Sequence, residues 1–367
     1  MADPIRVGIV GATVTTGGSG WGANAHVPAL HALPDYELVA VCTAHEDTAR
    51  ASAERFGAAL AFHDIDAMLA RADIDLVVVS VRVPLHHELV MTALRAGKDV
   101  FCEWPLGATL AEAEEMANLA REQSLRTAVG LQGRSDPSIR YARDLVAQGY
   151  VGEVLTANLS VMSQAVLERG PGRIWQAVRA NGANPLTIAG GHAIDALCAI
   201  LGELTEVSAR VTTRITTWRD EETGLDVPVD APDSIAVAGR FEGGAESAIQ
   251  IASVPAHATG TRLEIFGREG ALFLTAPSAN IGPNRLLGAR AGEALDELQP
   301  PDAYILAPEG TPSGPPRNVA HAYARMADAL GAAEAFAPDF DLAVTRHRLL
   351  DAIERSSATG AAVTVLG

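Results

Sequence analysis

The sequence predicts an α/β fold in which a doubly wound parallel sheet is followed by an α+β domain on an open, mostly antiparallel sheet. Strands and helices alternate over about the first 130 residues, an order typical of a parallel sheet covered by helices. Beyond that point several strands follow one another with few helices between them, which indicates α+β. A chain of 367 residues also suits two domains better than one. We expect domains at 1–133 and 134–367, with the C-terminal helices packing back on the first.

The elements of the first domain follow from apolar runs and their periodicity. The run at 74–81 is apolar on both faces, as a strand covered by helices on each side should be. The predicted strands are 5–10, 36–42, 74–81, 99–102 and 126–131, and the predicted helices are 23–33, 48–56, 65–72, 86–96 and 110–123.

The second domain is predicted in the same way. A Gly- and Arg-rich stretch, 163–185, is expected to form a loop over the cleft, and 300–316 is expected on the surface. If helices cover only one face of the open sheet, the other face is free to form a homo-oligomer, a dimer or a tetramer. The predicted strands are 153–162, 207–215, 234–241, 246–254, 262–266 and 271–275, and the predicted helices are 138–148, 188–201, 319–336 and 342–359.

The loop after the first strand is the first candidate site. Gly11 ends the strand, and Gly17, Gly18, Gly20 and Gly22 follow before a helix begins. A strand, a glycine loop and a helix N-terminus in that order form an anion site, because backbone N–H groups converge there and no side chain blocks a phosphate. The strict G-x-G-x-x-G spacing is absent, and a tight strand-to-helix turn is the alternative.

The composition indicates which classes of binding partner are not expected. There are 28 basic and 45 acidic residues, giving a net charge of −17, so nucleic acid is not expected as a partner. No apolar run is long enough to cross a bilayer and no signal pattern is present, so we expect a cytoplasmic protein. Cys42, Cys102 and Cys198 are expected to be buried thiols without metal-ligand spacing, and no metal is expected. Lys98 is the only lysine, so any chemistry that needs a titratable ammonium must use it.

The order of elements and motifs resembles the Gfo/Idh/MocA family of NAD(P)-dependent oxidoreductases, and its Gal80-like subgroup in detail. The resemblance implies a dinucleotide-binding Rossmann domain and a substrate domain. The residues that carry it are Val7-Gly8-Ile9-Val10-Gly11, Gly20-Trp21, His26-Val27-Pro28-Ala29-Leu30, His86, Ala93-Leu94-Arg95-Ala96-Gly97-Lys98, Cys102-Glu103-Trp104-Pro105-Leu106, Leu131-Gln132-Gly133-Arg134, Gly149-Tyr150-Val151-Gly152-Glu153, Gly191-His192-Ala193-Ile194-Asp195 and Pro338-Asp339-Phe340.

The chain departs from the family pattern at two acid–base positions. The family carries Glu-Lys-Pro at the end of the fifth strand, and here Trp104 replaces the lysine. Lys98 cannot substitute, because it enters that strand at the end opposite the cleft. The aspartate that the family places four residues before the histidine is Ile188 here.

His192 is therefore the predicted catalytic acid/base. A histidine near a helix start can face the cleft and take a proton near neutral pH, although a histidine satisfied inside the helix–sheet contact is the alternative. Asp195, one turn on, is expected to orient His192 or bind substrate. Arg134 and Trp175 are expected to line the substrate cleft, with a solvated arginine and a packed tryptophan as the alternatives.

The resemblance also implies cofactor contacts. Trp104 either stacks on the nicotinamide or walls its pocket, His86 lies near the cofactor or on the surface, and His26 is expected to be structural. The second strand ends without the carboxylate that holds an NAD ribose, so NADP is slightly favoured over NAD. The predicted cofactor-binding residues are Gly11, Thr13, Trp21, Gly22, Thr43, His45, Val81, His86, Glu103, Trp104 and Gln132.

Two functions are compatible with these features. The first is an oxidoreductase that transfers a hydride between NAD(P) and a sugar-like or polyol alcohol or carbonyl. The second is a catalytically silent NAD(P)-binding regulator resembling Gal80, which the loss of both the lysine and the aspartate favours.

Overall fold

The computed structural model describes residues 3–14, 20–332 and 334–365, and the chain forms two compact units. The first unit comprises residues 1–131, 171–173 and 306–345, and the second comprises 132–170, 174–305 and 346–367. The first break therefore falls two residues before the expected boundary, after residue 131 rather than 133.

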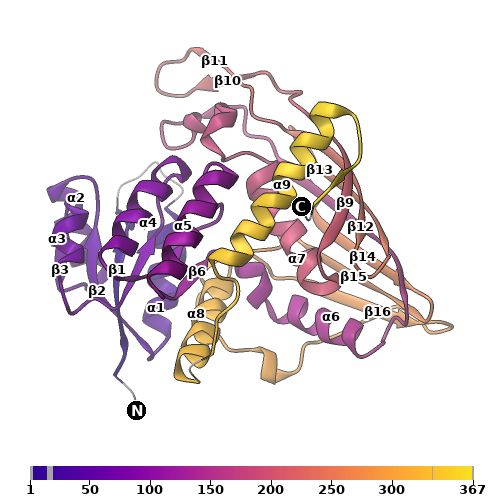
Figure 1. The fold of residues 1–367 in the computed structure, drawn as a ribbon, viewed down its shortest axis with the longest axis horizontal. Helices are drawn as coiled ribbons and strands as arrows, with labels where there is room; N and C mark the ends of the chain where they lie inside the picture. Colours follow the sequence, from indigo (N-terminus) through magenta and orange to yellow (C-terminus); the bar gives the residue numbers. More distant parts are fainter. Residues whose placement is uncertain (1–2, 15–19, 333, 366–367) are drawn as a thin grey trace. The chain divides into compact units, whose positions relative to one another are not determined.

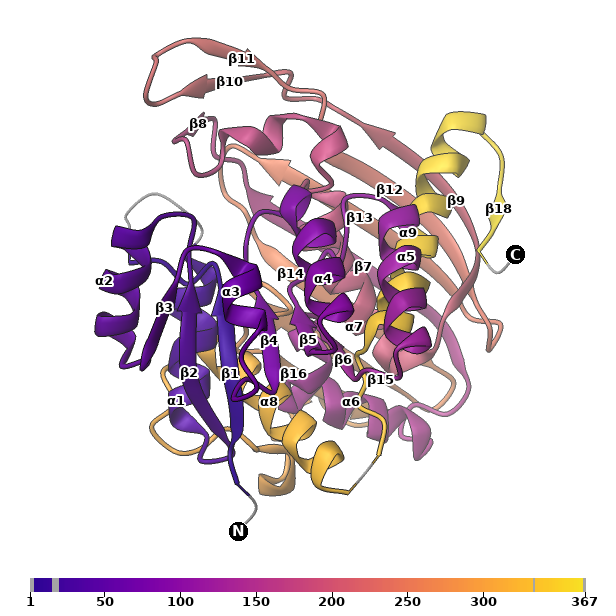
Figure 2. The ribbon, with the colours of Figure 1, turned by 60° about the vertical axis from the view of Figure 1, so that its left-hand side comes forward.

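The first unit is built on a six-stranded parallel sheet of order β3-β2-β1-β4-β5-β6 (Figure 2). The order runs outward from β1 in both directions, so the switch point lies between β1 and β4, where a crevice opens at the carboxyl ends of the strands. The doubly wound prediction is confirmed. The strands are β1 Ile5–Val10, β2 Tyr36–Cys42, β3 Leu60–Phe62, β4 Leu76–Val79, β5 Asp99–Cys102 and β6 Thr127–Val129.

The helices of the first unit cover this sheet. All four residues of β4 are buried, as a strand covered on both faces requires. Helix α2 ends at Gly57, whose φ of 68° gives the left-handed cap expected of a glycine stop. The helices are η1 Gly22–His26, α1 Val27–Ala32, α2 Glu46–Phe56, α3 Ile65–Leu69, η2 Val83–Leu85, α4 His86–Arg95, α5 Leu110–Glu122 and α8 Pro315–Gly331.

Helix α8 differs from its prediction at both ends. It begins at Pro315 rather than 319, because prolines are well tolerated in the first turn, where an N–H has no helical partner. It ends at Gly331 rather than 336. Helix α8 packs against η1 and α1. The core here includes Val7, Ile9 and Phe101 from the sheet.

The second unit is built on a nine-stranded mixed sheet of order β17-β16-β15-β14-β7-β13-β12-β9-β18 (Figure 1). Every neighbouring pair is antiparallel except β7 with β13, so the mostly antiparallel prediction is confirmed. Along β12, buried and exposed residues alternate, which gives the sheet one buried and one exposed face. The strands are β7 Val154–Gln164, β9 Leu204–Thr212, β12 Ser234–Phe241, β13 Glu246–Val254, β14 Gly260–Gly267, β15 Gly270–Ala276, β16 Arg285–Arg290, β17 Asp296–Glu297 and β18 Val363–Thr364.

Helices α6 (Pro137–Ala147) and α7 (Gly191–Leu201) pack on the buried face of this sheet. A π-helical turn, η6 (Leu186–Gly190), leads into α7. A Cβ atom at Gly190 would lie 2.7 Å from Cδ1 of Ile251, so the glycine lets the helix start lie directly on β13. The last helix, α9, runs over Phe340–Thr359.

The stretch predicted as a loop at 163–185 contains short elements of regular secondary structure. It contains β8 (Glu168–Arg169), which pairs with a hairpin of β10 (Thr217–Asp220) and β11 (Asp226–Pro228). Short 3₁₀ turns, η4 (Ile174–Ala177) and η5 (Arg179–Asn181), follow β8. Within the described ranges, no helix is both long enough and apolar enough to cross a membrane.

Candidate active site

The turn after β1 accepts only glycine at its first position. Gly11 has a φ of 97°, and a Cβ atom there would lie 2.2 Å from the carbonyl oxygen of Ser80, at the switch point between β1 and β4. At Gly22, a Cβ atom would lie 3.0 Å from Cα of Ala12. Both glycines therefore allow the backbone to pack closely on itself, Gly11 against the end of β4 and Gly22 against the turn after β1. Gly17 and Gly18 lie outside the described residues.

Trp21 adds a hydrogen-bond donor to this turn. Its indole Nε1 is buried and has no hydrogen-bond partner in the described part of the chain. A buried donor without an acceptor is costly, so the position is suited to an acceptor supplied by a ligand. The tight glycine turn and this donor together fit the phosphate groups of a dinucleotide. Thr13 follows the same strand, and Val81 follows β4 at the same edge.

The turn after β2 uses its polar side chains internally. The Thr43 hydroxyl donates to the His45 carbonyl at 3.0 Å and lies 2.7 Å from the Thr48 hydroxyl, which ties it to the start of α2. Thr43 is buried, whereas the His45 side chain is exposed. Arg50 pairs with Glu46 one turn into the helix. No carboxylate occupies position 43 or 45, as the sequence indicated.

His86 is a buried link between two strand ends, and its placement on the surface is ruled out. It is 1% exposed, with Nδ1 2.9 Å from the Pro105 carbonyl oxygen and Nε2 3.2 Å from that of Val81. Burial lowers the pKa of its imidazole, against the opposing effect of these carbonyls and of Glu103. The ring joins the turn after β4 to the turn after β5, and so shapes the carboxyl edge of the sheet.

Glu103 and Trp104 follow β5 and are both buried, with Trp104 only 5% exposed. Because so little of Trp104 is exposed, its ring is better placed to line the nicotinamide pocket than to stack on the nicotinamide. The Glu103 carboxylate accepts a hydrogen bond from His26, which in turn contacts Tyr323 of α8. His26 is buried, as its sequence setting suggested.

Lys98 is placed away from this edge. Its Nζ donates to the carbonyl oxygens of Arg71 and Ile74, at 2.6 Å and 2.9 Å, just before β4 begins. It therefore lies at the amino ends of β4 and β5, opposite Glu103 and Trp104. The inference that the only lysine cannot replace the family's catalytic one agrees with this geometry.

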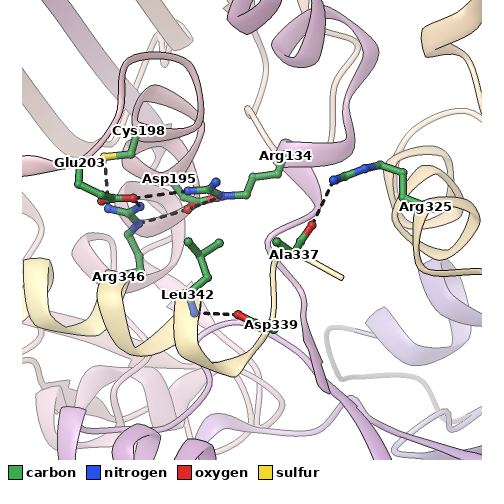
Figure 3. A network of polar contacts seen from close by, with 9 residues as sticks. All are labelled: Arg134, Asp195, Cys198, Glu203, Arg325, Ala337, Asp339, Leu342 and Arg346. Carbon is green, nitrogen blue, oxygen red and sulfur yellow. Dashed lines mark hydrogen bonds and ion pairs between the residues drawn. The ribbon is translucent and has the colours of Figure 1, made fainter. Parts of the chain in front are cut away.

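The second unit carries the predicted acid/base on α7. His192 is the second residue of that helix and is 6% exposed. Asp195, one turn on, does not stand alone: Nε of Arg134 donates to both of its carboxylate oxygens at 2.9 Å, and Nε of Arg346 donates at 3.2 Å (Figure 3). Arg134 therefore pairs with Asp195 inside the unit, and the solvated alternative for Arg134 is not what the structure shows.

Arg346 completes this cluster and was not predicted. It is fully buried and also donates to Glu203 at 2.9 Å and to the Cys198 sulfur at 3.2 Å (Figure 3). Burial alone would lower the pKa of its guanidinium, but the Asp195 and Glu203 carboxylates raise it above its usual value, so Arg346 stays charged. Burial raises the pKa of the Cys198 thiol to about 12, so the thiol stays neutral at neutral pH.

Two further predicted residues belong to short helical turns of the second unit. Gln132 is 1% exposed in η3 (Gln132–Ser135). Trp175 is half-buried in η4, where its carbonyl oxygen accepts a hydrogen bond of 2.6 Å from the Asn181 side chain. Cys42, Cys102 and Cys198 are buried free thiols, as predicted. In the described ranges, no group of three or more His, Cys, Asp or Glu side chains could hold a metal ion.

A doubly wound parallel sheet with a tight glycine turn at its switch point is the architecture of a dinucleotide-binding domain. Family models agree. Residues 5–131 match the oxidoreductase family with an NAD-binding Rossmann fold, and residues 137–276 match the C-terminal domain of Gal80p. The chain therefore combines a domain like the NAD-binding Rossmann domain of the Gfo/Idh/MocA oxidoreductases with a domain like the C-terminal domain of Gal80p.

Individual relatives include both enzymes and a regulator. Dehydrogenase aclE of Aspergillus oryzae is 37% identical over 57% of this chain and 58% of its own length. The galactose/lactose metabolism regulatory protein GAL80 of Saccharomyces cerevisiae is 29% identical over 66% of this chain and 59% of its own length. The chain thus matches less than two thirds of either relative.

Solved structures match over the whole chain. The oxidoreductase domain protein from Kribbella flavida has a TM-score of 0.87 and 25% identity, with 100% of each chain covered. Levoglucosan dehydrogenase in complex with NADH and L-sorbose has a TM-score of 0.86 and 22% identity, with 99% of each chain covered, a likeness that concerns the fold alone.

Proposed function

We propose that this protein is an NAD(P)-dependent oxidoreductase that acts on a CH–OH or carbonyl group of a sugar-like or polyol substrate. The observation that carries the proposal is the tight turn after β1, where Gly11 and Gly22 bring the backbone close together and the buried Trp21 indole N–H has no acceptor in the described part of the chain. The match of residues 5–131 to an oxidoreductase family supports it, and so does the sugar ligand named for levoglucosan dehydrogenase.

Each unit contributes a separate part of the proposed chemistry. Bound NAD(P) would supply the nicotinamide that exchanges a hydride with the substrate. Glu103 and Trp104 would shape the nicotinamide end of the first unit's site, while Gly11 and Trp21 would hold its phosphates. His192 would take the hydroxyl proton during oxidation and return it during reduction, because imidazole titrates near neutral pH.

Three residues of the second unit are proposed to act on the substrate. Trp175 would offer an apolar ring face to a sugar. Arg134 and Asp195 bond each other at 2.9 Å, so they would orient the substrate as a pair rather than singly. The same pair would hold α7, and hence His192, in place.

The coenzyme is proposed to be NADP or NAD, with NADP slightly favoured. Positions 43 and 45 are Thr and His, so neither carries a carboxylate that would repel the 2′-phosphate of NADP. The exposed His45 side chain could donate a hydrogen bond to that phosphate. Titrations with both coenzymes would settle the choice.

The kinetic test is turnover of a polyol and sugar panel with NAD and NADP, comparing wild type with His192→Gln. We expect kcat to fall about 100-fold or more, since a general acid/base typically contributes 10²–10⁴-fold. His347→Gln is the matched control, because His347 is the other buried histidine of that unit and has no proposed catalytic role. If kcat of His192→Gln stayed within about threefold of wild type, His192 could not be the acid/base.

A second function is favoured by a specific observation. Trp104 and Ile188 replace two acid–base groups of the family, and the relative GAL80 is a regulatory protein. A protein that bound NAD(P) tightly, turned over no member of the panel and captured a protein partner would be a dinucleotide-sensing regulator instead.

We also propose that two or more copies assemble in the cytoplasm through the exposed face of the nine-stranded sheet. That face is hollowed to about 1030 Å³ and lined by small and mixed-charge residues, including Ala236, Ala248, Arg210 and Glu264. Small side chains allow close approach, and both signs of charge allow a surface to complement its own copy. A monomeric mass by light scattering at micromolar concentration would contradict this assembly.

A further inference from the structure

Three buried polar side chains of the first unit are linked by hydrogen bonds in a series that ends at Glu103. The Tyr323 hydroxyl lies 2.8 Å from Nδ1 of His26, and Nε2 of His26 lies 2.9 Å from Oε1 of Glu103. The three residues come from α8, η1 and the turn after β5. The three residues are far apart in the sequence, so only the fold brings them together.

The two hydrogen bonds of this series run in one direction, from Tyr323 through His26 to Glu103. Because carboxylate oxygens accept hydrogen bonds, the N–H group at Nε2 of His26 donates a hydrogen bond to Oε1 of Glu103. Nδ1 of His26 then accepts a hydrogen bond from the Tyr323 hydroxyl. Each bond polarises the next in a buried setting, so the Tyr323 hydroxyl strengthens the hydrogen bond to Glu103.

Only the last member of the series reaches the surface of the unit. The side chain of His26 is 0% exposed and that of Glu103 is 11% exposed, while Tyr323 is 0% exposed. Gly130 borders the carboxylate on another side, where a Cβ atom would lie 2.4 Å from Oε1. The carboxylate is therefore held between His26 and Gly130 just beyond β5, and a small part of the Glu103 side chain is exposed.

We infer that His26 and Tyr323 are positioning residues, which hold the Glu103 carboxylate in one orientation as an acceptor for a hydrogen-bond donor of the bound dinucleotide. The inference rests on the proposed coenzyme function and deepens it. It gives His26 a binding role in addition to its place in the core.

The test is NADH affinity of the purified full chain, measured by the change in NADH fluorescence on binding. Tyr323→Phe removes one hydroxyl and leaves the ring in place. We expect the Kd for NADH to rise about three- to tenfold, the weight of one buried hydrogen bond. Tyr36→Phe is the matched control, because its hydroxyl lies in the same aromatic cluster but donates to the Tyr323 carbonyl at 2.9 Å rather than to His26. Its Kd should stay within about twofold of wild type.

Glu103→Gln shows whether the effect passes through the carboxylate. If it does, Tyr323→Phe adds little to the Kd of Glu103→Gln, whereas independent effects would multiply. His26→Gln is measured alongside, so that one poorly folded variant does not decide the outcome. Normal NADH affinity in folded Tyr323→Phe or His26→Gln would overturn this inference alone. Absence of both NADH and NADPH binding in wild type would overturn the proposed function as well.

Discussion

Single residues decide what the site can do, and the two buried histidines of the second unit illustrate it. His192 starts α7 and carries the proposed proton transfer. His347 lies in α9 and is 6% exposed. Its position gives it no proposed chemistry, but burial lowers the pKa of its imidazole to about 4. The same residue type therefore has a proposed catalytic role in one helix and makes stability depend on pH in another.

The His347 pKa predicts a loss of stability in mild acid. In the unfolded chain His347 takes up a proton below about pH 6.5, whereas in the folded chain it does so only near pH 4. The contribution of neutral His347 to the free energy of unfolding is therefore fully present above pH 6.5, and it is lost as the pH falls towards 4. Between pH 7 and pH 5 the contribution of His347 amounts to about 2 kcal/mol. Urea unfolding of wild type and His347→Gln at both pH values measures it. A pH dependence that is identical in the two proteins would contradict the prediction.

At the scale of single residues, the sequence revealed identities and local context but few partners. Gly11, Trp104 and Lys98 could be interpreted directly, because a strand end or a turn determines where they lie. Asp195 could not, since its partners Arg134 and Arg346 are 61 and 151 residues away. Tyr323 is 297 residues from His26, so nothing local connects the two.

Among the elements, α7 is the one whose placement matters most. Nine of its eleven residues are buried, and Asp195 is its only acidic residue. Two arginines neutralise that carboxylate, one from η3 and one from α9. A buried ion pair of this kind adds little net stability by itself, but losing one partner leaves a charge unpaired. The arginine cluster therefore fixes α7 against its neighbours.

Arg346→Met should accordingly be strongly destabilising. Removing the buried guanidinium leaves Asp195 without one of its two donors, a type of change that typically costs about 3–5 kcal/mol. Arg240→Met is the matched control, because Arg240 pairs with Glu246 on the exposed face of the sheet at 2.9 Å, with both side chains more than half exposed. Its urea midpoint should match wild type. Equal midpoints for the two variants would show that the cluster does not hold α7.

The elements also show where sequence patterns fail. The long apolar strands β1, β2 and β5 were predicted with their observed bounds. Strand β3 was missed because three residues cannot display a period, and the β10–β11 hairpin was missed because its strands are short and polar. The π-helical turns η1 and η6 were predicted only as parts of longer helices, since their composition does not distinguish them.

For the whole molecule, the order of elements was more informative than any single motif. It predicted both sheets, although the glycine spacing after β1 departs from the usual fingerprint. The C-terminal helices were expected on the first domain, and residues 306–345, which include α8, do belong to the first unit. The greater part of α9, from residue 346 on, belongs to the second unit instead. That division was not predictable, because it depends on the contacts of Arg346 with Asp195 and Glu203, which are far away in the sequence.

The central claim is that a dinucleotide binds at the turn after β1, and calorimetric titration with NAD(H) and NADP(H) tests it most directly. The controlled pair is Gly11→Ala and Gly97→Ala: both glycines have positive φ, but a Cβ atom meets the Ser80 carbonyl oxygen at 2.2 Å in the first and nothing within 4 Å in the second. We predict that wild type and Gly97→Ala bind at least one coenzyme and that Gly11→Ala binds neither. Failure of wild type to bind any coenzyme at millimolar concentration, or undiminished binding by a folded Gly11→Ala, would contradict the claim.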